Sequence, residues 1–175
     1  MNSFDDLYCD LKADIAAVAT PLFDTAEVFI RKRAGFVPQG TVLTSTGETR
    51  IVVAAPPDFE TRAVSPAEVL PLLHQALRNA ATYESLLAVA VVEDVTITPA
   101  GQPPTRAIKV LVEHSRGLTV ALYLPFTRRL LRGFTFGSTF AAVFTTVAIA
   151  PTAALAALAA VVATLALVAF AASGL

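Results

Sequence analysis

The last 42 residues of the chain carry no charged side chain, and this feature constrains the fold more than any other. All 13 Lys and Arg residues and all 14 Asp and Glu residues precede Phe134. A soluble domain would have to bury such a stretch on every side, whereas a bilayer accepts about 20 apolar helical residues directly. The sequence therefore predicts a folded domain over residues 1–127 and a membrane anchor over residues 134–175.

The length of the anchor predicts two crossings. A continuous helix of this length would extend about 63 Å, and the hydrocarbon core of a bilayer is only about 30 Å thick. Two spans, 134–150 and 152–173, fit that thickness better, with Pro151 as the hairpin turn between them. One bent or tilted span, with the remainder buried in protein, is the alternative.

Three arginines lie directly before the first span and form a basic juxtamembrane linker at 128–133: Arg128, Arg129 and Arg132. Positive charge beside a span stays cytoplasmic and is attracted to anionic headgroups. We therefore expect the chain at the inner (cytoplasmic) membrane, with the folded domain and both termini in the cytoplasm. The basic run at 31–33 is expected to join these arginines in one patch that faces the membrane.

Small residues recur at intervals of four in both spans, and such spacing lets helix backbones approach closely. They are Gly133, Gly137, Ala141 and Thr145 in the first span, and Ala153 and Ala157 in the second. The contact they predict lies either within the hairpin or between subunits, and the second arrangement makes the protein a homo-oligomer. The anchor has no ionisable side chain, which disfavours a secondary transporter.

Periodicity in residues 3–126 predicts an α+β domain with an antiparallel sheet, the order α-β-β-α-β-β-β, and helices on one face of the sheet. A kink, or a division into two helices, is expected near Pro21 in the first helix. Ser65, Pro66 and Glu68 form a capping box that begins the second helix. The expected helices are 3–33 and 65–82, and the expected strands are 41–44, 50–53, 86–98, 106–113 and 118–126.

This order of elements resembles that of profilin-like and roadblock-type domains, which use it for dimerisation and regulatory binding. Two stretches also resemble small bacterial α+β proteins to which no activity is attached. They are Gly-Phe-Val-Pro-Gln-Gly at 35–40, and Ala-Ile-Lys-Val-Leu-Val-Glu-His at 107–114 together with Gly117. The resemblance implies self-association and carries over no catalytic residue.

The motifs of common enzymes and metal sites are absent from the sequence. It has no GxxxxGK[ST], GxGxxG, GxSxG or HExxH, and Cys9 is its only cysteine. Adjacent Glu113 and His114 point to opposite faces of a strand, so they cannot act together on one substrate. We expect no cofactor and no metal, and the net charge of −1 disfavours nucleic acid as a partner.

These observations favour a non-catalytic, self-associating binding or scaffold module that is held at the membrane by its C-terminal anchor, with a further protein as its partner. An oligomeric membrane effector or pore subunit is the first alternative, and the spacing of small residues motivates it. A membrane-tethered enzyme with a site built from scattered polar residues is the second.

Overall fold

The computed structural model describes residues 4–60, 63–99, 101, 103–129 and 133–145. Its first eight elements follow the predicted order, since the first helix is divided in two. The helices are α1 (Phe4–Asp10), α2 (Lys12–Arg33) and α3 (Pro66–Tyr83). The strands are β1 (Gln39–Thr44), β2 (Thr49–Val52), β3 (Leu86–Ile97), β4 (Thr105–His114), β5 (Leu118–Arg129), β6 (Gly133–Phe136) and β7 (Phe140–Thr145).

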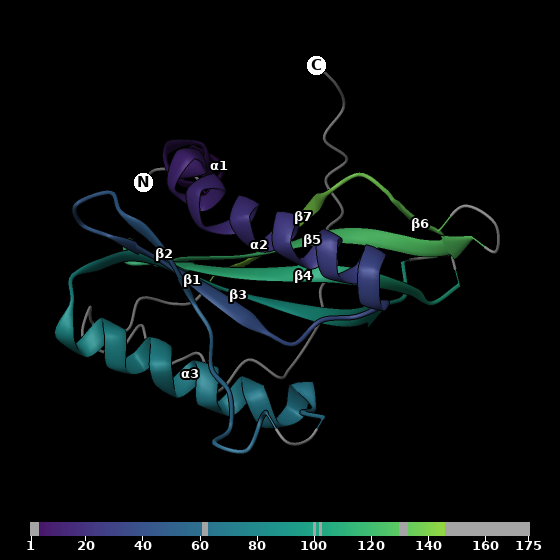
Figure 1. Ribbon diagram of the computed structural model, residues 1–175. Coiled ribbons are helices and arrows are strands. Elements are labelled where there is room, and N and C mark those ends of the chain that lie inside the picture. The colour runs from purple at the N-terminus through teal and green to yellow at the C-terminus, as the bar shows by residue number, and fades with distance from the viewer. Residues whose placement is uncertain (1–3, 61–62, 100, 102, 130–132, 146–175) are drawn as a thin grey trace.

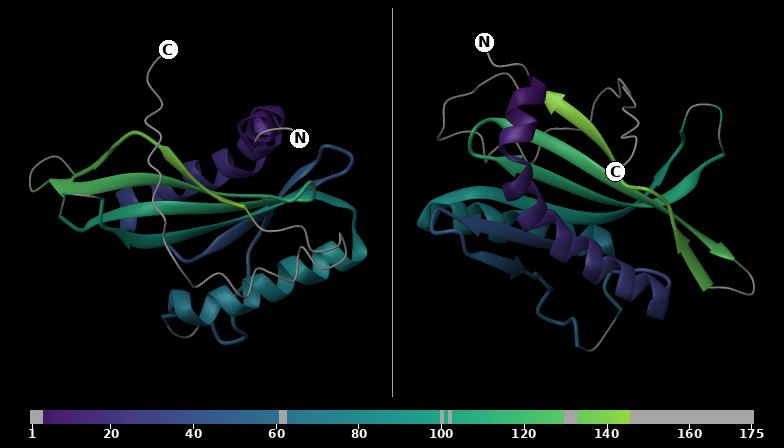
Figure 2. Two further views of the ribbon diagram at one scale, coloured as in Figure 1. Left: turned by 180° about the vertical axis from the view of Figure 1, so that it is seen from behind. Right: turned by 90° about the horizontal axis from the view of Figure 1, so that it is seen from above.

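The strands form one antiparallel, curled sheet in the order β2-β1-β3-β4-β5-β6, and β7 also pairs with β5. β6 pairs with the end of β5, from Phe126 to Arg129, whereas β7 pairs with its beginning, from Leu118 to Tyr123. The two short strands therefore follow one another along the same side of β5, and together they form one edge of the sheet (Figure 2). β2 is the opposite edge.

The helices cover opposite faces of the sheet, which corrects the expectation that they share one face. α2 lies above the sheet and α3 below it (Figure 1). The apolar stripe of α2 packs on alternate residues of β3, β4 and β5, and these side chains make the main core. α3 packs Leu73 and Leu77 against Val42, Val89 and Val91 in a second, smaller cluster. Two faces of one sheet are thus buried separately.

The break in the N-terminal helix lies at Leu11, and the expected division into two helices near residue 20 is wrong. α2 continues through Pro21, and the Thr25 hydroxyl donates to the Pro21 carbonyl at 2.7 Å. Val18 and Leu22, on either side of the proline, are both fully buried. We attribute the continuity of α2 to this burial, because packing of an apolar face commonly outweighs local propensity.

The capping box at the start of α3 is confirmed. The Glu68 carboxylate accepts hydrogen bonds from the Ser65 backbone N–H at 3.0 Å and from its hydroxyl at 2.9 Å. α3 then runs through Pro71, although the proline lacks the N–H that would pair with the Ala67 carbonyl in a regular helix. Val69 and Leu73, on either side of it, are buried, and this packing sustains the helix.

Residues 133–145 are the main departure from expectation, because the structure has strands where the first membrane span was expected. Phe134 and Phe136 flank the Phe126 ring, and Phe140 stacks on Tyr123 at 5.3 Å between ring centroids. Sheet pairing with β5 satisfies the backbone of these aromatic and β-branched residues, which favour strands. A spanning helix from 134 is therefore wrong as far as residue 145.

The strands in residues 133–145 also separate residues that were expected to share one helix face. Gly133, Gly137, Ala141 and Thr145 align only along a helix, and here they lie in β6, in β7 and in the turn between them. Arg128 and Arg129, expected in a linker, continue β5. None of the helices within the described ranges has the length and apolar character needed to cross a bilayer. Other residues with a predicted role lie outside the described residues: Arg132, Pro151, Ala153, Ala157 and the span 152–173.

Candidate functional site

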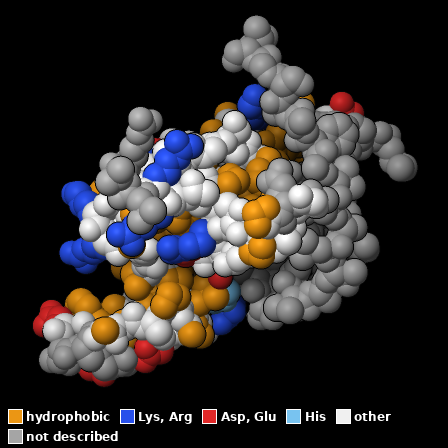
Figure 3. Space-filling model, turned by 90° about the vertical axis from the view of Figure 1, so that its right-hand side faces the viewer, with side chains coloured by type: hydrophobic (Ala, Val, Ile, Leu, Met, Phe, Trp, Pro, Cys, Tyr) orange, Lys and Arg blue, Asp and Glu red, His pale blue; other side chains and the backbone are white. Residues whose placement is uncertain are grey.

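Basic side chains gather at the end of the molecule where α2 stops and β5 and β6 meet, as the space-filling view of this side shows (Figure 3). α2 ends in three consecutive cations, and its last turns contact β6. β4 and β5 add cations from the sheet. We call this surface the basic end and define it by Arg31, Lys32, Arg33, Arg106, Arg128 and Arg129.

Aromatic rings lie beneath these cations. The rings of Phe134 and Phe136 lie 6.1 and 5.9 Å from that of Phe126, which is itself buried. The sequence places them together because Phe126 and Phe136 are partners in the β5–β6 register. Phe134 is opposite Arg128 in the same register, so a cation and a ring are neighbours across the strands.

Two arginines lie over these rings. The Arg31 guanidinium carbon is 4.6 Å from the centre of the Phe136 ring, and that of Arg106 is 4.9 Å from Phe126. Such cation–π contacts contribute about 0.5–1 kcal/mol each at exposed sites. Arg31 thereby links the end of α2 to β6. The basic residues 31–33 and the arginines at 128 and 129, which are far apart in the sequence, therefore lie on one surface.

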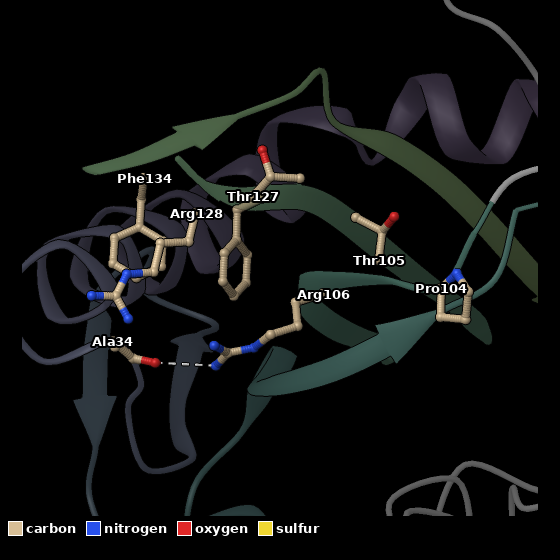
Figure 4. A pocket seen from close by; sticks show the side chains of 8 residues that line it. Ala34, Pro104, Thr105, Arg106, Thr127, Arg128 and Phe134 are labelled. Atoms are coloured by element: carbon tan, nitrogen blue, oxygen red, sulfur yellow. Dashed lines mark hydrogen bonds between the residues drawn. The ribbon is translucent and has the colours of Figure 1, made fainter. Parts of the chain in front are cut away.

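Arg106 is held on several sides. Its guanidinium pairs with Asp94, and Nε donates to Asp94 Oδ1 at 3.3 Å. Nη2 also donates to the Ala34 carbonyl at 3.2 Å (Figure 4), which closes the C-terminal end of α2. Ala34 itself has φ +60°, the left-handed conformation that ends a helix. The guanidinium is therefore fixed in place, and its charge is largely neutralised by Asp94.

A pocket of about 280 Å³ opens beside these groups. Its lining includes Ala34, Arg106, Phe126, Arg128 and Phe134. The guanidinium groups of Arg106 and Arg128 both point toward the end of α2 (Figure 4). The pocket thus combines an apolar aromatic wall with two guanidinium groups, and such a combination favours a small anion that carries carbon atoms.

The basic end has an excess of positive charge. Asp94 pairs with Arg106, and Glu27 pairs with Arg31 at 3.4 Å. Among the residues that the structure describes, no carboxylate forms an ion pair with the other four cations, which are Lys32, Arg33, Arg128 and Arg129. Four unneutralised charges on one surface attract anions at a distance as well as in contact.

The face of the sheet that α3 partly covers carries other titratable groups. Lys109 pairs with Glu93 at 3.2 Å, and burial lowers the pKa of His74 on α3, against the opposing effect of Glu93. Burial raises the pKa of Glu113, on the same face, to about 7. Glu113 and the pocket lie on opposite faces of β4 and β5, so this acid cannot act on a ligand in the pocket.

His114 has a structural role that the sequence did not reveal. Its Nε2 lies 3.1 Å from Asp14 Oδ2, and its Nδ1 accepts the Arg116 backbone N–H at 3.1 Å. Because Nδ1 accepts, Nε2 carries the proton of the neutral ring and donates to the carboxylate. The side chain is buried, and the interaction ties α2 to the β4–β5 turn. No acid lies beside His114 on its own face of β4, and Asp14 reaches the ring from a position 100 residues earlier in the chain.

Of the residues predicted from the sequence, Arg128 and Arg129 lie at the basic end and Arg132 lies outside the described residues. Neither Arg106 nor the three rings were predicted as part of this surface. The alternation of residues 126 and 128 signals a shared face, but the pairing with β6 was hidden by the apolar run. No three His, Cys, Asp or Glu side chains lie close enough to hold a metal ion within the described part of the chain.

The basic end and residue 145 lie at opposite ends of β5. Thr145 pairs with Leu118 at the start of β5, whereas Arg128 lies ten residues further along the same strand. At about 3.3 Å per residue, the two points are about 33 Å apart. The arginines expected directly beside a span therefore lie at the other end of the domain from the last described residue.

Comparison of the chain with protein-family models, with characterised proteins and with solved structures gives no match.

Proposed function

We propose that this protein is a non-catalytic binding module held at the cytoplasmic face of the inner membrane, with its basic end resting on anionic headgroups. The observation that carries the proposal is the basic end itself, where four unneutralised cations lie around buried and half-buried aromatic rings. Each Lys or Arg near an anionic membrane surface contributes about 1 kcal/mol of binding free energy.

The apolar segment after β7 supplies the anchor in this proposal. Because residues 134–145 belong to the sheet, 30 uncharged residues, 146–175, follow it. The 22 residues of 152–173 would form a helix of about 33 Å, which matches one crossing of the hydrocarbon core. The proposal thus replaces the two-span hairpin by the single span with a buried remainder.

The two attachments fix how the domain would lie. The anchor follows Thr145 at one end of β5, and Arg128 is at the other end. Both reach one flat bilayer when β5 runs parallel to the membrane and the β6–β7 edge faces it. This orientation also covers an open sheet edge, which would otherwise be a site for unwanted strand pairing.

The alternatives have less support. The pore subunit rests on small residues at intervals of four, and four of the six lie in strands or a turn. Self-association keeps the resemblance in element order, together with Ala153 and Ala157, as its support. An enzyme would need an acid with a shifted pKa near the pocket, but Glu113, whose pKa is raised, lies on the other face of the sheet.

Alkaline extraction of membranes tests the anchor with the full chain. We expect the wild-type protein to stay in the membrane pellet at high pH. Ala157→Arg combined with Val162→Arg places two charges in the span, each costing about 2.5–3.5 kcal/mol, and should release the protein. Ala157→Leu with Val162→Leu is the matched control and should stay in the pellet. Complete extraction of the wild-type chain would refute the proposal.

A further inference from the structure

We infer that the pocket at the basic end binds a phosphate ester, with the headgroup of an anionic phospholipid as the ligand that fits its position. This inference rests on the proposed membrane function, because that function brings the pocket to the headgroup layer. The pocket would bind the headgroup of one lipid molecule, whereas the rest of the basic end is attracted to the anionic membrane surface as a whole.

Arg128 supplies the charge of this site. It is exposed, it lines the pocket, and no carboxylate pairs with it among the described residues. Its guanidinium carries five N–H donors in a planar fork, a geometry that suits two oxygens of one phosphate. The neighbouring residue Arg129 points to the opposite face of the strand and does not line the pocket.

Arg106 supplies fixed donors. Its Nε and Nη2 are engaged by Asp94 and by the Ala34 carbonyl, and the guanidinium plane lies over Phe126. Within the described part of the chain, Nη1 has no hydrogen-bond partner, so its two N–H groups remain for a ligand. Because the side chain is already held, little conformational entropy is lost when an oxygen binds there.

The aromatic wall distinguishes an ester from a free ion. Phe126 and Phe134 border the same cavity as the two guanidinium groups, and their rings offer contact to carbon rather than to water. A phosphate attached to glycerol would place its oxygens on the arginines and its carbons on these rings. The volume of about 280 Å³ lies just below the range of about 300–1,000 Å³ for pockets that enclose drug-sized ligands, so a headgroup fits.

Calorimetric titration of the full chain in a neutral detergent tests this inference. The probes are dihexanoyl phosphatidic acid, dihexanoyl phosphatidylcholine and inorganic phosphate. We expect phosphatidic acid to bind, inorganic phosphate to bind more weakly, and phosphatidylcholine not to bind. Arg128→Gln should weaken phosphatidic acid by roughly tenfold or more, as expected for a lost charge-assisted hydrogen bond. Phe134→Ala should weaken phosphatidic acid and leave inorganic phosphate unchanged.

Arg129→Gln is the matched control, because it removes the same charge from the adjacent residue outside the pocket. Equal weakening by Arg128→Gln and Arg129→Gln would overturn the inference, since it would mean diffuse attraction. Absence of binding by every phosphate probe, with the chain still retained in membranes, would overturn it and leave the proposed function standing. Arg128-dependent binding of inorganic phosphate alone would support a phosphate site and overturn the lipid as its source.

Discussion

Glu113 offers a stability test whose sign follows from its position. It lies on β4 between Val89 of β3 and Thr119 of β5, and burial raises its pKa from 4.5 to about 7. The folded protein therefore holds this proton more tightly than the unfolded chain does. The contribution of Glu113 to the free energy of unfolding is therefore most favourable below pH 4.5. It decreases between pH 4.5 and about 7, and it is constant at higher pH.

The size of the effect follows from the same shift. A difference of about 2.5 pKa units corresponds to at most about 3.4 kcal/mol at pH 8, at about 1.36 kcal/mol per unit. The Glu113 side chain is partly exposed, and solvent screens part of this cost, so we expect about 1–2 kcal/mol. Glu113→Gln removes the charge and keeps the shape. It should raise the free energy of unfolding by that amount at pH 8 and leave it unchanged at pH 4.

Urea unfolding of the full chain in mild detergent, followed by circular dichroism at both pH values, measures the difference. Glu60→Gln is the control, because Glu60 is an exposed carboxyl in the loop before α3. It should shift stability by less than about 0.5 kcal/mol, as surface substitutions usually do. A Glu113→Gln variant that is no more stable than the wild type at pH 8, or that gains equally at pH 4, would refute the assignment of a buried charge.

Three further substitutions test the packing in the same unfolding assay, and a change of less than about 0.5 kcal/mol in any of them would contradict its account. His114→Leu leaves Asp14 without its partner across the core and should cost about 1–3 kcal/mol. Gly40→Val should cost about 1–3 kcal/mol, because even a Cβ there would lie 3.1 Å from the Ala90 carbonyl and 3.3 Å from Leu77 Cδ1, which displaces α3. Ser65→Ala loses the hydroxyl contact to the Glu68 carboxylate and should cost about 1 kcal/mol.

Local patterns predicted the elements well because the determinants of each lie within a few residues. The capping box at Ser65 began α3 at the expected position, and the alternation in β4 and β5 predicted their buried faces. The helix was expected to divide near Pro21 because the local effect of proline opposes helix formation, whereas burial of the residues around it on the sheet sustains the helix. Intrinsic helix propensity does not account for packing against the sheet.

The candidate site depends on contacts between residues far apart in the chain, and periodicity does not encode these. Arg106 reaches the Ala34 carbonyl across 72 residues, and Asp14 reaches His114 across 100. The apolar character of residues 134–145 fits either a membrane span or a strand, and only the partners available on β5 decide between them. The sequence predicted that residues 31–33 and the arginines of β5 would form one basic patch. It did not predict that Phe126, Phe134 and Phe136 would lie beneath them.

The central claim is that the β6–β7 edge lies on the membrane, and fluorescence quenching tests it most directly. With Cys9→Ser, a single fluorophore can be attached at Ser138→Cys, in the exposed turn between β6 and β7, or at Thr49→Cys on β2. These edges are about 24 Å apart, at about 4.8 Å per strand. In anionic vesicles with headgroup spin-labelled lipid, we predict strong quenching at position 138 and weak quenching at position 49. Equal quenching at both positions, or stronger quenching at position 49, would contradict the account.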